Sequence, residues 1–177
     1  MNDPALIAHL GLGSNLGDRW AFVTSAFERI LALDGEAIIS SIYESVPVGG
    51  PSDQGPYLNA VVRCELELGP TEVLALAGEL ERAAGRVRTE RWGPRTLDVD
   101  VLTLEVRRGD LLEALSIVTP LLTIPHPRLE ERAFVLAPLE ECAPHLVPRA
   151  WRDRLGGAQA VHDAVRVVGH IVRDVAP

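Results

Sequence analysis

Apolar and polar residues alternate with a period of two in several stretches of the chain, and this alternation predicts β-strands. The first stretch runs from Leu6 to Leu12, and the most regular one runs from Tyr57 to Leu68. Residues 97–101 begin another strand, and residues 36–44 form a less regular one. In the most regular strand the even positions are apolar and most odd positions are polar, which is typical of an antiparallel sheet with one open face.

Two stretches between these strands have apolar residues at the three- and four-residue spacing of an amphipathic helix. The first covers residues 19–33 and follows Asp18, a suitable N-cap, and the second covers residues 71–85. A further helix is predicted over residues 133–141, while residues 111–118 fit either a short helix or a strand.

The order of these elements, β-α-β-β-α-β, indicates the fold class. It predicts an α+β protein with a ferredoxin-like split β-α-β arrangement, an antiparallel sheet, and helices packed on one face. The 177 residues are expected to form a single domain. Residues 151–177 are a C-terminal extension, in which an amphipathic helix is predicted over residues 158–172.

A long loop over residues 45–56 separates two of the predicted strands, because its prolines and glycines break every periodicity. Loops of this length in compact domains are often binding loops. Tyr57 and Asn59 follow it and share the open face of the next strand. An aromatic ring beside a carboxamide suits stacking on a flat heterocycle and bonding to its edge. The pattern alone favours the alternative, a solvent-facing tyrosine and an asparagine beside the turn.

The glycine-rich segment Gly11-Leu-Gly-Ser-Asn-Leu-Gly17 is similar to a dinucleotide-binding loop. Its spacing, G-x-G-x-x-x-G, is one residue too long for that fingerprint, and the βαβ unit expected after it is absent from the pattern. We therefore interpret the segment as a turn from a strand to a helix.

The strongest chemical signal is a group of arginines followed by an Asp-x-Asp pair. Four of them, Arg86, Arg88, Arg91 and Arg95, lie within ten residues, and Asp98 and Asp100 come next. Because side chains alternate along a strand, both carboxylates should emerge on one face while the aliphatic residues between them face the core. Two carboxylates and several guanidinium groups suit a Mg²⁺-bound polyphosphate, although such clusters are also common on solvated surfaces.

Composition limits the classes of partner. The net charge is −8, which disfavours nucleic acids and anionic membranes, and it makes the local arginine group stand out. All 17 basic residues are arginine, so a Walker A lysine and a Schiff-base mechanism are excluded. Cys64 and Cys142 lack metal-site spacing and are expected to be thiols in a reducing compartment. With no signal-peptide pattern and no apolar run of bilayer length, we expect a cytoplasmic protein.

His126 lies between Pro125 and Pro127, which hold it in a rigid, non-helical segment. Arg128 and Arg132 follow, so this segment fits a phosphate contact. A single histidine is nevertheless more often structural than functional.

Several motifs appear in a fixed order along residues 6–145: Gly13-Ser-Asn-Leu-Gly17, residues 41–47, residues 54–59, Gly85-Arg-Val-Arg88, Arg91-Trp-Gly-Pro-Arg-Thr-Leu-Asp-Val-Asp100, and Pro125-His126 with Phe134. In this order the chain resembles the 6-hydroxymethyl-7,8-dihydropterin pyrophosphokinase family of folate biosynthesis. The resemblance implies a ferredoxin-like fold and the transfer of pyrophosphate from ATP to the pterin hydroxymethyl group, with release of AMP.

The resemblance also implies residue roles. Asp98 and Asp100 would hold two Mg²⁺ ions, and Arg86 and Arg95 would be catalytic. The implied ATP contacts are Glu81, Arg88, Arg91, Trp92, His126 and Arg132. The implied pterin contacts are Ser45, Val46, Val48, Tyr57, Asn59, Trp92 and Phe134, which reverses the pattern-only interpretation of Tyr57 and Asn59. We expect a monomer whose partners are ATP and a reduced pterin, without nucleic acid or membrane.

Two other functions remain as alternatives. A Mg²⁺-dependent nucleotidyltransferase also uses an Asp-x-Asp strand, but it would release pyrophosphate instead of AMP. A non-enzymatic binding module of the same fold would need neither the carboxylates nor the arginines in this arrangement, and its strand aromatics would cluster in the middle of the sheet.

Overall fold

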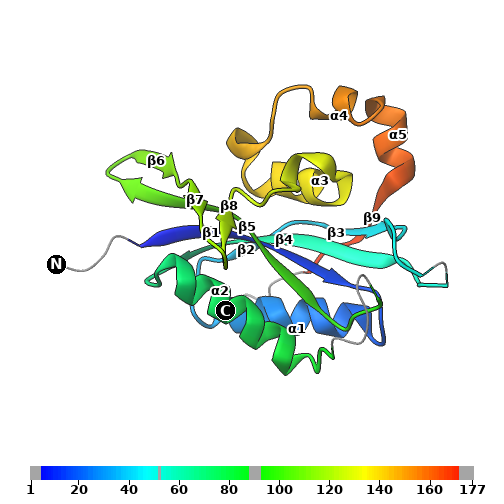
Figure 1. The fold of residues 1–177 in the computed structure, drawn as a ribbon, viewed down its shortest axis with the longest axis horizontal. Helices are drawn as coiled ribbons and strands as arrows, with labels where there is room; N and C mark the ends of the chain where they lie inside the picture. Colours follow the sequence, from blue (N-terminus) through cyan, green and yellow to red (C-terminus); the bar gives the residue numbers. More distant parts are fainter. Residues whose placement is uncertain (1–4, 52, 88–92, 172–177) are drawn as a thin grey trace, which may run out of the picture.

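Strand β1 (Leu6–Ser14) lies inside a seven-stranded sheet in the computed structural model, which describes residues 5–51, 53–87 and 93–171 (Figure 1). The remaining elements are, in order, α1 (Arg19–Leu31), β2 (Ile38–Ile39), β3 (Ile42–Ser45), β4 (Tyr57–Leu66), α2 (Pro70–Ala83), β5 (Asp98–Arg108), β6 (Leu111–Ala114), β7 (Ile117–Val118), β8 (Thr123–Ile124), a 3-10 helix (Leu129–Glu131), α3 (Ala133–Cys142), a second 3-10 helix (Pro144–Leu146), α4 (Trp151–Arg154), α5 (Gly157–Ala164) and β9 (Val165–Gly169).

The strand order β6-β5-β1-β4-β3-β9 gives the sheet its split topology, and β2 also pairs with β4. β1 is antiparallel to both β4 and β5, and β3 is antiparallel to β4. Helix α1 therefore connects β1 to a strand that runs parallel to it with β4 between, and α2 connects β4 to β5 with β1 between. This arrangement confirms the predicted ferredoxin-like class.

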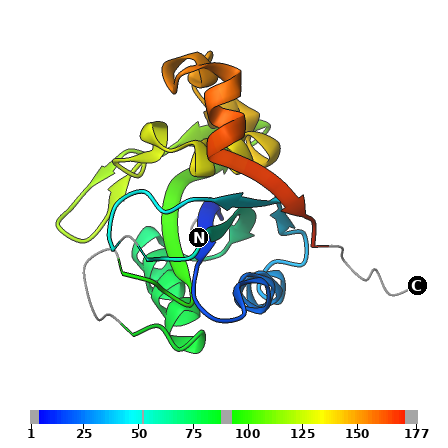
Figure 2. The ribbon, with the colours of Figure 1, turned by 90° about the vertical axis from the view of Figure 1, so that its right-hand side faces the viewer.

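Helices cover both faces of the sheet, which corrects part of the prediction. α1 and α2 pack on one face, as expected, whereas α3 to α5 cover part of the opposite face (Figures 1 and 2). The core is accordingly divided in two. Leu97, Val99 and Val101 face the α1–α2 side, and Val61 and Leu102 face α3 on the other. The second layer comes from residue 133 onward, after the β-α-β-β-α-β pattern has ended.

Most predicted elements are confirmed, one open alternative is decided, and two local predictions change. The carboxylate of Asp18 caps α1 by accepting a 3.0 Å hydrogen bond from the Ala21 amide. The first predicted turn begins late, because β1 continues to Ser14. Of the two alternatives for residues 111–118, the strand is the one found, as β6 and β7. The helix predicted over 158–172 ends at Ala164, and β9 follows it.

Valines explain the change in the tail. Three of the five residues of β9 are valine, a β-branched residue that favours strands, and β9 pairs with the edge of β3. Sequence periodicity alone does not reveal that this edge is available. No helix in the described part of the chain is long and apolar enough to cross a membrane.

Candidate active site

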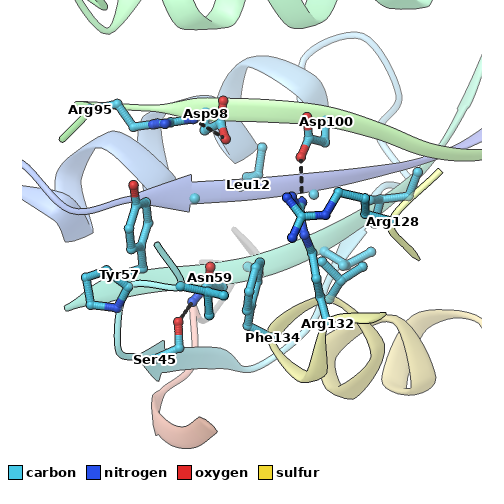
Figure 3. A pocket seen from close by; sticks show the side chains of 18 of the residues that line it. Leu12, Ser45, Tyr57, Asn59, Arg95, Asp98, Asp100, Arg128, Arg132 and Phe134 are labelled. Carbon is cyan, nitrogen blue, oxygen red and sulfur yellow. Dashed lines mark hydrogen bonds and ion pairs between the residues drawn. The ribbon is translucent and has the colours of Figure 1, made fainter. Parts of the chain in front are cut away.

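A cavity of about 110 Å³ lies on the face of the sheet that carries α3, across β1, β4 and β5 (Figure 3). Its walls come from segments far apart in the sequence: β1, the loop after β3, the beginning of β4, the beginning of β5, and residues 128–135. The cavity therefore exists only once the sheet has assembled.

Two glycines of β1 form the floor of this cavity. Gly13 pairs with Asp98 on β5 and with Asn59 on β4, and Gly11 pairs with Asp100 on β5. A β-carbon at Gly13 would lie 3.8 Å from atoms of Asn59, Asp98 and Tyr57, in the space between the two neighbouring strands. Glycine here keeps that space open, so the sequence feature interpreted as a turn belongs to the floor of the site.

The predicted acidic pair lies along one wall. Asp98 and Asp100 both line the cavity, on the same face of β5, while Val99 between them is buried in the core. This alternation confirms the expected geometry. The Asp98 carboxylate accepts hydrogen bonds from Arg86 at 2.5 Å and from Arg95 at 2.9 Å. Two guanidinium groups thus converge on one carboxylate.

Among the described residues, Asp100 has weaker guanidinium contacts than Asp98. A guanidinium nitrogen of Arg132 lies 3.7 Å from its carboxylate. Burial, together with the charge of Asp98, raises the pKa of Asp100. Burial also lowers the pKa of Arg132. A cation between the two carboxylates would relieve the repulsion that raises the pKa of Asp100.

The opposite wall combines apolar and hydrogen-bonding groups. Every predicted pterin contact within the described residues lines the cavity: Ser45, Val46, Val48, Tyr57, Asn59 and Phe134. Asn59 is 5% exposed, so the strand face that the alternation predicts to be open is covered at this position. The face is covered because α3 packs over β4.

Hydrogen bonds fix the orientation of the Asn59 amide. Its nitrogen donates to the Ser45 hydroxyl at 3.0 Å and to the Tyr43 carbonyl at 3.4 Å. The amide oxygen is left on the side of Gly13. Figure 3 shows the rings of Tyr57 and Phe134 on either side of Asn59. Burial raises the pKa of Tyr57, so its hydroxyl stays protonated at neutral pH.

Asn15 does not line the cavity, but it holds the backbone of Arg95, which does, and the sequence interpretation gave it no role. It is 6% exposed, its backbone amide donates to the Arg95 carbonyl, and its side chain accepts from the Arg95 amide. The same side chain donates to Gln54 and to the Gly55 carbonyl in the long loop. The Gly-Ser-Asn motif was visible in the sequence, but only the structure shows that its asparagine connects the Arg95 backbone to the long loop.

Only one of the predicted ATP contacts within the described residues lines the cavity. Arg132 lines the cavity, whereas Glu81 and His126 lie outside its lining. Glu81 accepts a 3.0 Å hydrogen bond from the Val99 amide and is paired with Arg86. His126 accepts from the Arg128 amide at 3.1 Å, and burial lowers its pKa. The predicted residues Arg88, Arg91 and Trp92 lie outside the described residues. Arg128, in the cavity wall, adds a guanidinium group.

Fold and cavity together define a ferredoxin-like α+β protein with a small-molecule site in which carboxylates and guanidinium groups face an apolar, amide-bearing wall. Residues 9–144 match the sequence profile of the 7,8-dihydro-6-hydroxymethylpterin-pyrophosphokinase family. The chain belongs to this family, whose members are ATP-dependent diphosphotransferases, as the resemblance of its motifs implied.

Similar proteins agree with this assignment. The chain is 42% identical over 141 residues to the 2-amino-4-hydroxy-6-hydroxymethyldihydropteridine pyrophosphokinase of Methylorubrum extorquens, covering 79% of this chain and 84% of that protein. It is 37% identical over 170 residues to the Bacillus subtilis protein of the same name, covering 88% and 96%. A solved structure of Plasmodium falciparum HPPK-DHPS with SDX-DHP has a TM-score of 0.59 at 14% identity. It covers 92% of this chain, which spans about half, 47%, of that longer chain and shares its fold.

Proposed function

We propose that this protein transfers the terminal pyrophosphoryl unit of ATP to the hydroxymethyl group of 6-hydroxymethyl-7,8-dihydropterin and releases AMP, in folate biosynthesis. One observation carries the proposal: Asp98 and Asp100 face the same cavity as Tyr57, Asn59 and Phe134, in a chain of this family. A site with a charged wall and an aromatic, amide-bearing wall matches a polyphosphate meeting a flat heterocycle.

The pterin is proposed to occupy the apolar side of the cavity. Tyr57 and Phe134 offer ring faces for stacking, and Asn59 offers an amide edge whose orientation is fixed by Ser45. Arg132 lies over the Phe134 ring at 5.5 Å, a cation–π contact that limits how that ring can move. Val46 and Val48, exposed on the long loop, are placed to cover the bound ring.

The carboxylate pair fits the two Mg²⁺ ions that the family resemblance implies. Among the described residues no group of three or more His, Cys, Asp or Glu side chains is arranged to hold a metal. A metal here would therefore rest on Asp98 and Asp100 and complete its coordination with substrate oxygens, as Mg²⁺ commonly does. When bound, Mg²⁺ would neutralise phosphate charge and help to align the reacting groups.

The residues of the chain supply binding and charge stabilisation. The pterin hydroxymethyl oxygen attacks the β-phosphorus of ATP, the new oxygen–phosphorus bond forms, and the bond to the α-phosphate bridging oxygen breaks so that AMP leaves. Arg86 and Arg95, which converge on Asp98, are positioned to stabilise charge on the transferred group. Asp100, which lines the cavity beside Asp98, is the candidate acceptor of the hydroxyl proton.

Product analysis tests this function directly. The protein is mixed with ATP, MgCl₂ and 6-hydroxymethyl-7,8-dihydropterin, and the nucleotide and pterin products are identified by mass. We expect AMP and a pterin diphosphate in equal amounts. Release of pyrophosphate would instead support a nucleotidyltransferase, and the absence of any new product would support a binding module.

A further inference from the structure

The C-terminal tail closes one side of the sheet, next to the proposed pterin wall. The family match ends at residue 144, and β9 lies beyond it. β9 pairs with β3, with Val165 opposite Ser45 and Arg166 opposite Glu44. Val165 is 6% exposed, and Gly169 packs so tightly against Trp20 that a β-carbon there would be 2.7 Å from its ring. The tail is thus attached to the main sheet and to α1.

A series of ion pairs and hydrogen bonds connects this tail to the long loop. Arg166 donates to one oxygen of Glu44 at 2.5 Å, and Arg19 donates to the other at 3.1 Å. The same Arg19 nitrogen donates to the Pro56 carbonyl at 2.7 Å. The Glu44 side chain is 16% exposed, so this carboxylate is better shielded from solvent than an ordinary surface group. The two arginines also hold the pKa of Glu44 low, the Arg166 hydrogen bond most of all.

Two members of this series, Glu44 and Pro56, directly precede residues that line the cavity. Ser45 follows Glu44 directly, lines the cavity, and accepts the hydrogen bond that orients Asn59. Pro56 precedes Tyr57, which supplies an aromatic wall. A shift of Glu44 would therefore displace Ser45, its neighbour in the chain. It would also displace Tyr57, through Arg19 and Pro56. Among the described residues Glu44 makes its side-chain contacts with Arg19 and Arg166, and none of them is a direct contact with Asp98 or Asp100 on the other side of β1.

We propose that Glu44 is a positioning residue for the pterin wall, held by Arg166 of the tail and by Arg19 of α1. The binding test of this role rests on the proposed function, because it measures affinity for the pterin. It gives the tail a function beyond packing: β9 fixes the position of Ser45 and, through Arg19, of the Pro56–Tyr57 peptide. Pterin affinity should depend on this contact, whereas ATP affinity should not.

The test compares variants of the full-length chain. Arg166→Met removes the tail contact at a side chain that is 69% exposed, and Arg166→Lys keeps its charge. Glu44→Ala removes the shared carboxylate. Arg154→Met is the control, because Arg154 also lies in the tail, is 49% exposed, and forms its ion pair with Glu130 and not with Glu44. Binding of 6-hydroxymethyl-7,8-dihydropterin is measured in the presence of a nonhydrolysable ATP analogue, and binding of that analogue is measured alone.

We expect Arg166→Met to weaken pterin binding about twofold to fivefold, as for a partly exposed ion pair, with Arg166→Lys restoring most of it. Glu44→Ala should weaken it roughly tenfold, because it leaves two arginines without their carboxylate. Analogue affinity should change less than about twofold, in line with additivity for distant sites. Equal loss of pterin and analogue affinity in the Glu44 and Arg166 variants, or an effect of Arg154→Met as large as theirs, would overturn the positioning role.

Amide hydrogen exchange separates this inference from the proposed function. Glu44→Ala should speed exchange in residues 43–45 and 57–59 of the ligand-free protein, whereas Arg154→Met should not. If the wild-type protein binds no pterin, the proposed function fails, and the exchange result still decides whether Glu44 fixes these segments. If exchange there is unchanged, the positioning role fails even when catalysis is confirmed.

Discussion

Asn15 and Arg95 hold each other by two hydrogen bonds. The Asn15 amide donates to the Arg95 carbonyl at 3.1 Å, and the Arg95 amide donates to the Asn15 side-chain oxygen at 2.8 Å. These bonds fix the backbone from which the Arg95 guanidinium reaches Asp98. A mostly buried asparagine after β1 therefore fixes the backbone position of Arg95, a proposed catalytic residue.

Replacing Asn15 should harm both stability and catalysis. Asn15→Ala leaves the Arg95 amide without its acceptor and releases Gln54 and Gly55, so we expect a stability loss of about 1–3 kcal/mol. Urea unfolding measures this change. Steady-state kinetics should show a kcat reduced by at least about tenfold, because a small displacement of Arg95 costs transition-state stabilisation.

Asn15→Asp is the informative control for that variant. It keeps an oxygen for the Arg95 amide but loses the donor to Gln54 and Gly55. If this variant is as inactive as Asn15→Ala, contacts with the long loop matter more than the bond to Arg95.

Removing the Asp98 carboxylate should abolish turnover without unfolding the protein. Asp98→Ala removes an oxygen ligand for the proposed Mg²⁺ ions and releases Arg86 and Arg95, so we expect kcat to fall by roughly a thousandfold or more. Single-turnover formation of AMP measures the loss, and circular dichroism checks the fold. A variant with a near-normal rate would contradict the metal role of the pair.

Asp100→Asn should be inactive and yet more stable at neutral pH. Burial and the charge of Asp98 raise the pKa of Asp100 above its unfolded value, so the ionised form destabilises the fold. This cost is absent at low pH, appears as pH rises through the raised pKa, and is complete above it. The melting temperature of the variant should therefore exceed that of the wild type at pH 7, with the difference shrinking towards pH 4. An equal difference at both pH values would contradict this origin.

Arg95→Ala should lower kcat more than ATP affinity. We propose that its guanidinium group meets charge that develops during transfer, and such interactions contribute most in the transition state. We expect kcat to fall about a hundredfold or more, with the dissociation constant of a nonhydrolysable analogue changing only severalfold. Arg107→Ala, at the far end of β5, breaks the ion pair with Glu65 and should leave kcat near normal.

His9 should make the protein sensitive to acid. It lies buried on β1, 3.0 Å from the Thr103 hydroxyl, and burial lowers its pKa to about 3. Between this value and the unfolded value near 6.5, the unfolded chain binds a proton that the folded chain does not. Stability is therefore lost as pH falls below about 6.5, by up to ~1.4 kcal/mol per pH unit for this proton.

A His9→Gln variant isolates that contribution. Its stability should fall less steeply than that of the wild type between pH 6.5 and pH 4, as measured by urea unfolding at each pH. His162→Gln, at an exposed site on α5, should keep the wild-type slope. Identical slopes in all three proteins would show that His9 does not drive the acid sensitivity.

The sequence by itself determined most of the secondary-structure elements before the tail and the chemistry of the acidic wall of the site. Alternation along residues 97–101 put Asp98 and Asp100 on one face and their aliphatic neighbours in the core, because a strand has a fixed period of two. The element order then predicted the split sheet. The motif order identified the family, since its residues are adjacent in the chain and need no folded structure to be recognised.

Only the tertiary structure decided which segments meet. Asn59 and Asp98 lie 39 positions apart, and they flank the same cavity because both pair with Gly13 of β1. Local patterns also failed in the tail, where β9 forms because the edge of β3 accepts it. Period and propensity act within one segment, whereas strand pairing and burial depend on partners distant in sequence, so the two walls of the site became neighbours only through folding.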